Sequence, residues 1–322
     1  MQMQKALRFL AILLAAQLLL ALGLNLGGPR LAAHPGDAPL LDLAGKSVDR
    51  ITLEGGEGKS LSLSKTSDGW VLPAQDDFPA DADKVTRLLE RLQGLRHGLP
   101  VATSSGALKR FKVAEDDFER RIRLAAGDDI LATLYVGTSP GVRRGHLRRD
   151  GDDAVYAMEF ASYDVPLKSE DWEDKAILAL PREEIATIQV ADLTLRPQGD
   201  TGWAAQGLAD NEALSIEAAG ELADKLAELR IGAVLGREKR ADYALDEPAL
   251  QFTVTRKGGE RIDYRLGKRD NDYVLKVSSR EEYFRLPSYT GDALVEAAGR
   301  DRLVAAKTGD DAESPPEAAS AS

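Results

Sequence analysis

The chain has 322 residues, of which 43% are hydrophobic, and a formal net charge of −11. This length is typical of about two domains, each able to bury a core. The negative charge argues against general nucleic-acid binding, because a phosphate backbone would repel the chain. The absence of cysteine excludes disulfides, thiolate metal ligands and cysteine nucleophiles. The three histidines are too widely spaced for a zinc motif, so we expect neither a metal nor a cofactor.

The N-terminal segment predicts a membrane anchor. Residues 9–28 carry no charge and follow Lys5 and Arg8, and this length suits a helix that crosses a bilayer. Positive charge stays in the cytoplasm, so we expect a single-pass inner-membrane protein with its N-terminus inside and most of the chain in the periplasm. A cleaved signal peptide is the alternative, although no clear small-x-small site follows the apolar run. Residues 1–29 would then be a cytoplasmic stub and anchor, and residues 30–41 a linker.

Residues 42–178 form the first of two predicted repeats. Apolar residues alternate on both sides of the glycine-rich segment 55–58, which predicts a hairpin, and Trp70 and Leu72 follow on another short strand. Val85 and the leucines from 88 to 95 recur at helical spacing and predict an amphipathic helix with Asp81 as its N-cap. The sequence GGEGKS lacks the spacing of a phosphate-binding loop, and the aspartates before the helix lack the closing glutamate of a calcium loop.

The later part of this repeat predicts a hairpin around residues 127–129 and two more short strands. Between those strands lies the most concentrated group of basic residues in the chain. Two interpretations stay open for it: a solvated hairpin face, or a patch that binds an acidic partner or a headgroup. The candidate interaction patch consists of Arg143, Arg144, Arg148 and Arg149.

The pattern restarts after residues 164–180, which predict a short helical connector containing Trp172. In residues 179–303, Ser215 is the expected cap of a second helix, and residues 257–259 the turn of a second hairpin. Equivalent positions recur in order at slowly falling offsets: Trp70 to Trp203 is 133, Leu88 to Leu222 is 134, Gly137 to Gly267 is 130, and Tyr156 to Tyr283 is 127. We therefore predict an α+β fold in which an N-terminal transmembrane helix precedes two tandem repeats. Each repeat is a mostly antiparallel sheet with one packed amphipathic helix, and residues 304–322 form a disordered tail.

Several of these segments resemble a bacterial family known as domain of unknown function 4340. The shared features are DGW at 68–70 with Pro79-Ala80-Asp81, FKV at 111–113, YVG at 135–137, SEDWEDKAIL at 169–178, and YALDEPALQFTV at 243–254 followed by RLGK at 265–268. The similarity spans roughly residues 42–303. Lys112 and Ala244 stand where the family's turn would carry glycine, which suggests drift or a differently shaped loop. The resemblance implies an envelope protein that is associated with gliding-motility-type ABC transport systems.

These observations favour a membrane-anchored periplasmic accessory or scaffold protein without catalytic activity. It is expected to bind an ABC-type transporter, such as its permease, or another envelope component. A periplasmic module that binds a small molecule, glycan or lipid in a groove between the repeats is the alternative, with Trp70, Trp172 and Trp203 as stacking candidates. A hydrolase is the third possibility, but no nucleophile, base or carboxylate pair is singled out by spacing.

Overall fold

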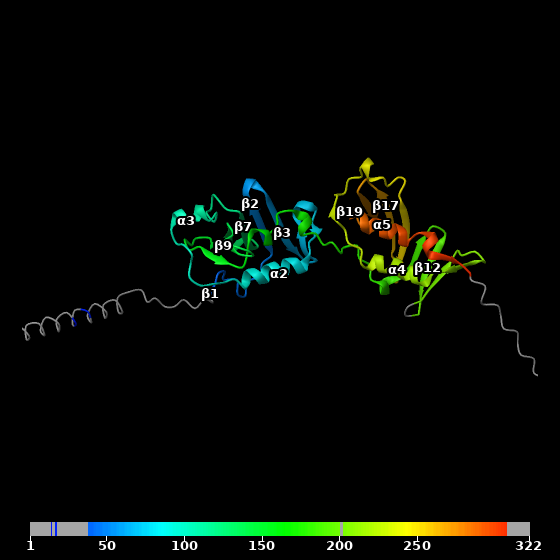
Figure 1. Ribbon diagram of the computed structural model, residues 1–322, viewed down its shortest axis with the longest axis horizontal. Helices are drawn as coiled ribbons and strands as arrows, with labels where there is room; N and C mark the ends of the chain where they lie inside the picture. The colour runs from blue at the N-terminus through cyan, green and yellow to red at the C-terminus, as the bar shows by residue number, and fades with distance from the viewer. Residues whose placement is uncertain (1–13, 15–16, 18–37, 200–201, 308–322) are drawn as a thin grey trace, which may run out of the picture. The chain divides into compact units, whose positions relative to one another are not determined.

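The computed structural model describes residues 14, 17, 38–199 and 202–307 (Figure 1). The predicted membrane segment, residues 9–28, lies outside the described residues except for Leu14 and Gln17. Among the residues that are described, no helix is both long and apolar enough to cross a bilayer. Close contacts divide the chain into two compact units. Unit 1 comprises residues 1–60 and 87–167, and unit 2 comprises residues 61–86 and 168–322.

The predicted α+β class is confirmed, with few helices and mostly antiparallel sheets. The first sheet has the order β10-β9-β8-β7-β2-β3-β4-β5. Alternation along β2 directs Ile51 and Leu53 into the core, and the predicted glycine-rich turn follows as a single 3-10 turn. The bounds are β2 (Arg50–Gly55), η1 (Gly56–Gly58), β3 (Ser60–Thr66), β4 (Gly69–Leu72), η2 (Pro73–Gln75), β5 (Phe78–Pro79), β7 (Arg120–Ala126), β8 (Asp129–Val136), β9 (Gly145–Arg149) and β10 (Tyr156–Met158).

Two helices and a small separate sheet accompany this sheet. Helix α2 (Ala82–Gln93) begins where predicted, because the Asp81 carboxylate accepts the amide of Lys84 at 2.9 Å. Its apolar side buries Val85, Leu88 and Leu92. Helix α3 (Ser105–Arg110) occupies a stretch where the sequence predicts no helix. A separate two-stranded sheet pairs β1 (Ala38–Pro39) with β6 (Arg96–His97).

The second sheet has the order β13-β12-β11-β16-β17-β18-β19-β15. Its strands are β11 (Ile185–Val190), β12 (Leu193–Gln198), β13 (Gly202–Gln206), β15 (Ala233–Val234), β16 (Leu250–Arg256), β17 (Arg261–Lys268), β18 (Asp272–Val277) and β19 (Tyr283–Pro287). The helices are α4 (Ile216–Ala227), α5 (Ser288–Ala297) and α6 (Arg300–Leu303), with 3-10 turns η5 (Arg182–Glu184) and η6 (Ala241–Tyr243). The predicted cap of α4 is confirmed, because the Ser215 hydroxyl accepts the Ala218 amide at 3.3 Å. Strand β14 (Glu212–Leu214) pairs with β20 (Val304–Ala306), so regular structure continues past residue 303.

The two sheets share one strand order. Reading from β10 to β4 in the first sheet matches reading from β19 to β13 in the second, strand for strand. In both, three consecutive strands are followed along the chain by a helix of 12 residues. Helix α2 follows strands β2, β3 and β4, and helix α4 follows strands β11, β12 and β13. Each of these helices buries one apolar stripe.

The same backbone arrangement, a left-handed turn packed against a glycine, occurs at the end of β8 and at the end of β17. Lys112 and Ala244 both adopt left-handed backbone angles, with φ of 52° and 51°. A Cβ on Gly137 would meet the carbonyl oxygen of Phe111 at 2.0 Å, and one on Gly267 would meet that of Tyr243 at 1.9 Å. Both turns adopt the left-handed conformation that glycine favours, although Lys112 and Ala244 occupy it. Glycine is required instead at positions 137 and 267, where a Cβ would collide with the backbone of these turns.

The sequence predicts a short helical connector over residues 164–180, and its helical parts in the structure are 3-10 turns rather than an α-helix. Single 3-10 turns, η3 (Ser162–Asp164) and η4 (Ser169–Asp171), precede Trp172, whose side chain is completely buried. The Trp172 carbonyl accepts the amide of Asp81 at 2.7 Å. This hydrogen bond joins the connector to the start of α2 in unit 2.

Candidate functional site

Unit 1 contains a groove beside the short strand β10. Its volume is about 480 Å³, and its walls come from β10, from β6 and from the end of α2. Three arginines face it, and Arg91 and Arg96 from the α2–β6 segment meet Arg144 from the turn before β9. We call this feature the β10 groove.

The groove exists because β6 does not close the edge of the sheet. In unit 2, strand β15 pairs directly with β19, and Val234 lies opposite Phe284. In unit 1, β6 instead pairs with β1, where Arg96 lies opposite Pro39. Strand β15 therefore forms the edge of the second sheet, whereas its counterpart β6 does not pair with β10. The groove lies beside β10 as a result.

The backbone edge of β10 is already bonded. Alternate residues of a strand direct their backbone groups to the same side, and here those are residues 155, 157 and 159. Val155 exchanges hydrogen bonds with residues 101 and 102 at 2.7 and 2.8 Å. Arg144 donates to the Ala157 carbonyl at 2.7 Å, and Arg91 donates to the Glu159 carbonyl at 3.4 Å. Arginines therefore cover the carbonyls that an added strand would need.

Arg91 is held in place by a two-point ion pair. Its two terminal nitrogens donate to the two carboxylate oxygens of Asp164 at 2.8 and 3.1 Å. This hydrogen bonding raises the pKa of Arg91, although partial burial opposes the shift. The guanidinium also lies 5.1 Å from the centre of the Phe160 ring. Arg91 is thus a fixed positive group, about half of whose side chain is exposed.

The four arginines of the predicted patch do not share one surface. Arg143, Arg144 and Arg149 are exposed, whereas Arg148 is only 6% exposed. Arg148 donates to the carbonyls of Val113 and Asp152 at 2.7 and 3.0 Å, and its guanidinium lies 4.4 Å from the centre of the Tyr135 ring. It is therefore a core residue of unit 1.

Only Arg144 of that patch lines the β10 groove. Its neighbours there, Arg91 and Arg96, are about fifty residues earlier in the chain, and sequence reasoning did not select them. Arg91 reads as an ordinary solvent-facing residue of an amphipathic helix. The spacing of charges along the chain carries no signal that would bring these residues together.

Two loops beside the groove expose large apolar side chains. Leu99 is 77% exposed and Val101 49% exposed, and both belong to the loop that follows β6. Val142, in the turn between β8 and β9, is 89% exposed. Both loops are tied to the same strand, since the Val101 amide donates to the Val155 carbonyl and Arg144 donates to that of Ala157. Apolar tips and arginines therefore lie close together at this edge of unit 1.

The two histidines of unit 1 that the structure describes are packing residues. His97 lies in the groove wall with its ring 4.3 Å from that of Tyr156. His146 is buried against Phe111, and its Nδ1 lies 2.9 Å from the Thr138 hydroxyl. Burial lowers the pKa of His146, so its ring is neutral at pH 7.

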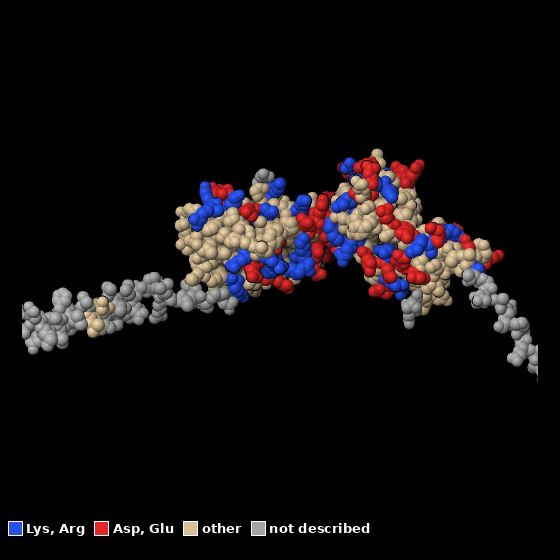
Figure 2. All heavy atoms as spheres, in the orientation of Figure 1, with Lys and Arg blue, Asp and Glu red and all other residues tan. Residues whose placement is uncertain are grey.

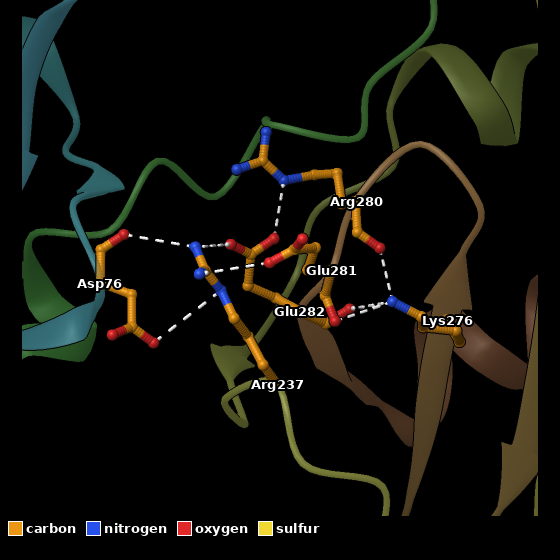
Figure 3. Close-up of polar contacts among 6 residues, drawn as sticks. All are labelled: Asp76, Arg237, Lys276, Arg280, Glu281 and Glu282. Carbon is orange, nitrogen blue, oxygen red and sulfur yellow. Dashed lines mark hydrogen bonds and ion pairs between the residues drawn. The ribbon is translucent and has the colours of Figure 1, made fainter.

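Unit 2 contains a denser cluster of charges, shown in Figure 3. Arg237 pairs with Glu282 at 3.3 Å, with Glu281 at 3.2 Å and with Asp76 at 3.8 Å. Arg280 pairs with Glu282 at 3.2 Å. Burial opposes ionisation of Glu282, but a backbone hydrogen bond, Arg280 and Arg237 outweigh it and hold the pKa of Glu282 below its ordinary value. The buried carboxylate is matched by its own ion pairs, so the cluster is a structural clamp.

The buried Glu173 is satisfied in the same way. Its carboxylate accepts from the Gln75 amide at 3.1 Å, from Lys175 at 2.7 Å and from the Val234 backbone amide at 3.2 Å. Its neighbour Trp172 is buried as well. The segment SEDWEDKAIL therefore packs unit 2 together.

The three tryptophans that were stacking candidates, Trp70, Trp172 and Trp203, are all buried. This burial favours a packing role for all three, although Trp203 also lines a shallow pocket together with Arg182 and Lys257. Within the described ranges, no three His, Asp or Glu side chains gather as metal ligands would. Figure 2 shows basic and acidic atoms intermixed over both units on the face drawn.

Fold and site together define an α+β protein built on two antiparallel sheets of matching strand order, with a basic groove at one edge of the first. Comparison with protein-family models matches residues 70–248 to the family described as Domain of unknown function (DUF4340). The match covers more than half of the chain, which therefore belongs to this family. The curated proteins contain no match. The solved structures contain none either.

Proposed function

We propose that this chain is a non-catalytic accessory or scaffold protein of the bacterial envelope, anchored in the inner membrane by residues 9–28 with its body in the periplasm. Through unit 1 it contacts a component of that membrane. Its protein partner in this proposal is an ABC-type transporter, such as the permease, or another envelope component. The observation that carries the proposal is the β10 groove, open beside β1, where the chain arrives from the anchor.

We further propose that residues 42–178 and 179–303 arose as a tandem duplication. The shared strand order, the two 12-residue helices and the paired left-handed turns over Gly137 and Gly267 support this origin. In such a pair, one copy can keep a closed sheet edge while the other opens its edge for binding. The different placement of β6 and β15 fits that division of roles.

The pairing of the buried charged groups favours a binding function over catalysis. The buried carboxylates of Glu173 and Glu282 are held in hydrogen bonds and ion pairs, and such groups stabilise a fold. Groove residues such as Arg144, by contrast, reach solvent beside exposed apolar side chains, as binding surfaces do.

The proposal is tested by photo-crosslinking of the full chain in native membranes. A photoreactive residue at Leu99 or Val142 should give an ultraviolet-dependent adduct with a membrane component, and mass spectrometry identifies that component. The same residue at Ile130, which is 65% exposed but lies outside the groove, is the matched control and should give no adduct.

Two results would defeat this proposal. One is release of the chain from membranes by alkaline carbonate, which would remove the anchor. The other is the absence of any adduct from both Leu99 and Val142 while the chain remains in the membrane. If affinity purification recovers no transporter, the transporter is excluded as the partner, and the rest of the proposal stands.

A further inference from the structure

We propose that the β10 groove and its two flanking loops form a docking face for anionic phospholipid, and that this face rests on the same bilayer that holds the anchor. The inference depends on the membrane anchoring proposed above. It names the component that the groove contacts as the lipid headgroup layer.

The first support is the chemistry of the rim. A soluble surface rarely gathers large apolar side chains at loop tips without a use for them. Leu99, Val101 and Val142 project from two loops tied to one strand. Basic groups stand among them, with Arg144 in the groove and Arg143 exposed beside Val142. Apolar side chains within a basic surround are typical of surfaces that enter the boundary between headgroups and acyl chains.

The second support is the position of β1. Its first residue, Ala38, follows the proposed anchor by about ten residues, and a chain of that length spans at most roughly 35 Å. Strand β1 then pairs with β6, so that Pro39 lies opposite Arg96, a groove residue. The groove is thereby kept within a short tether of the membrane, which gives it a high effective concentration at the lipid surface.

The third support is charge. The whole chain has a net charge of −11 and would be repelled by an anionic membrane. Arg91, Arg96 and Arg144 line the groove together with one carboxylate, that of Glu159, and Arg143 is exposed beside them. Arg91 is paired with Asp164. An anionic surface attracts a basic face, and this attraction favours the orientation of unit 1 in which the groove lies toward the lipid.

Lipid fits the site better than an added peptide strand does. Peptide binding by strand addition needs backbone groups that are unoccupied at the sheet edge. Along β10, Val155, Ala157 and Glu159 already accept hydrogen bonds from residue 101, Arg144 and Arg91. A headgroup phosphate instead accepts hydrogen bonds from a guanidinium, and Arg144 donates to the Ala157 carbonyl through one terminal nitrogen only.

The test uses the full chain, which lacks cysteine and so accepts one labelled cysteine without background. Leu99→Cys, Val142→Cys and Ile130→Cys carry an environment-sensitive dye, and each protein is reconstituted into nanodiscs. One set of discs is phosphatidylcholine alone, and the other contains one third phosphatidylglycerol. We expect a blue shift and brighter emission at positions 99 and 142 only in the anionic discs, and no change at position 130.

A charge variant tests the arginines. Arg143→Glu with Arg144→Glu should abolish the response of the position-142 dye, since each basic residue at an anionic surface contributes about a fivefold change in affinity. Arg196→Glu with Arg261→Glu makes the same charge change on exposed positions of unit 2 and should leave the response intact. Thermal unfolding of each variant confirms that it is folded.

The outcomes separate the two proposals. Equal responses in both kinds of disc would overturn the headgroup inference, as would an unaffected response in the Arg143/Arg144 variant. No response in either disc, combined with a protein adduct at Leu99 or Val142 in native membranes, would replace lipid with a protein partner and leave the proposed function standing. Failure of the chain to enter discs at all would remove the anchor, and the inference with it.

Discussion

Two glycines, Gly137 and Gly267, carry a strict requirement at the residue scale. Each lies directly beneath a left-handed turn, where the carbonyl of Phe111 or of Tyr243 occupies the space of a Cβ. The left-handed residues above them, Lys112 and Ala244, are tolerated although neither is glycine. A side chain at position 137 or 267 must displace backbone atoms, whereas a non-glycine residue in the left-handed conformation costs only about 1–2 kcal/mol.

Gly137→Ala and Gly267→Ala should each lower the free energy of unfolding by about 3 kcal/mol, because the added methyl group must displace backbone. Urea denaturation of the full chain measures the change. Gly141→Ala and Gly258→Ala are matched controls, because nothing lies within 4 Å of an added Cβ there. A loss as large in the controls as at positions 137 and 267 would show that contact with the carbonyls is not the cause.

Ala244→Gly should stabilise the chain by about 1 kcal/mol, because it relieves the left-handed strain at φ 51°. Ala204→Gly, at an exposed position of strand β13, should have the opposite sign and cost about 0.5–1 kcal/mol. Both are measured as shifts of the urea midpoint at constant slope. A destabilised Ala244→Gly variant would contradict the strain interpretation.

At the scale of elements, the cluster around Glu282 ties several loops of unit 2 together. Arg237, from the segment after β15, meets the turn between β18 and β19 and also reaches Asp76 before β5. Ion pairs at exposed positions contribute little, but a buried carboxylate leaves uncompensated charge when its partners are lost.

Glu282→Gln should therefore destabilise the chain at pH 7, by about 2 kcal/mol. The folded pKa of Glu282 lies below its unfolded value, so its contribution is present above that unfolded value and is lost as pH falls through the folded pKa. The difference between wild type and variant should be constant above about pH 5 and should shrink below about pH 4. Urea denaturation across this range measures it, and a difference that grows on acidification would refute the ion-pair account.

At the scale of the whole molecule, the compact units and the predicted repeats follow different boundaries. Residues 61–86 precede most of the first repeat's strands, yet they belong to unit 2 with residues 168–322. Phe78 shows why, since it is buried in a hydrophobic cluster of unit 2 and its ring lies 6.2 Å from that of Phe284. The hydrophobic core therefore crosses the repeat boundary at residue 178.

A fragment that ends at residue 178 should consequently fail to unfold cooperatively, because it exposes Phe78 and the apolar residues around it. Calorimetry of residues 38–178 and binding of a hydrophobic dye provide the measurement. In the intact chain, Phe78→Ala should cost about 3–4 kcal/mol. A fragment with a sharp transition and no dye binding would show that the first repeat folds independently.

Sequence alone determined the local elements of this protein. Alternation predicted the strands, helical spacing predicted α2 and α4, and both caps, Asp81 and Ser215, were identified correctly. These features depend on neighbours along the chain, so periodicity and side-chain chemistry specify them. Some of the motifs that resemble the family also lie in these elements: the end of DGW at 68–70 begins strand β4, and RLGK at 265–268 ends strand β17.

Only the tertiary structure decided what the charged residues do. It buried Arg148 under Tyr135 although the other three arginines of the predicted patch are exposed, and it brought Arg144 beside Arg91 and Arg96 from a distant helix end. Both results follow from where β6 pairs and which way β9 faces. Such long-range pairings depend on which sheet edges remain available after the hairpins form, and the pattern within a single segment does not encode that.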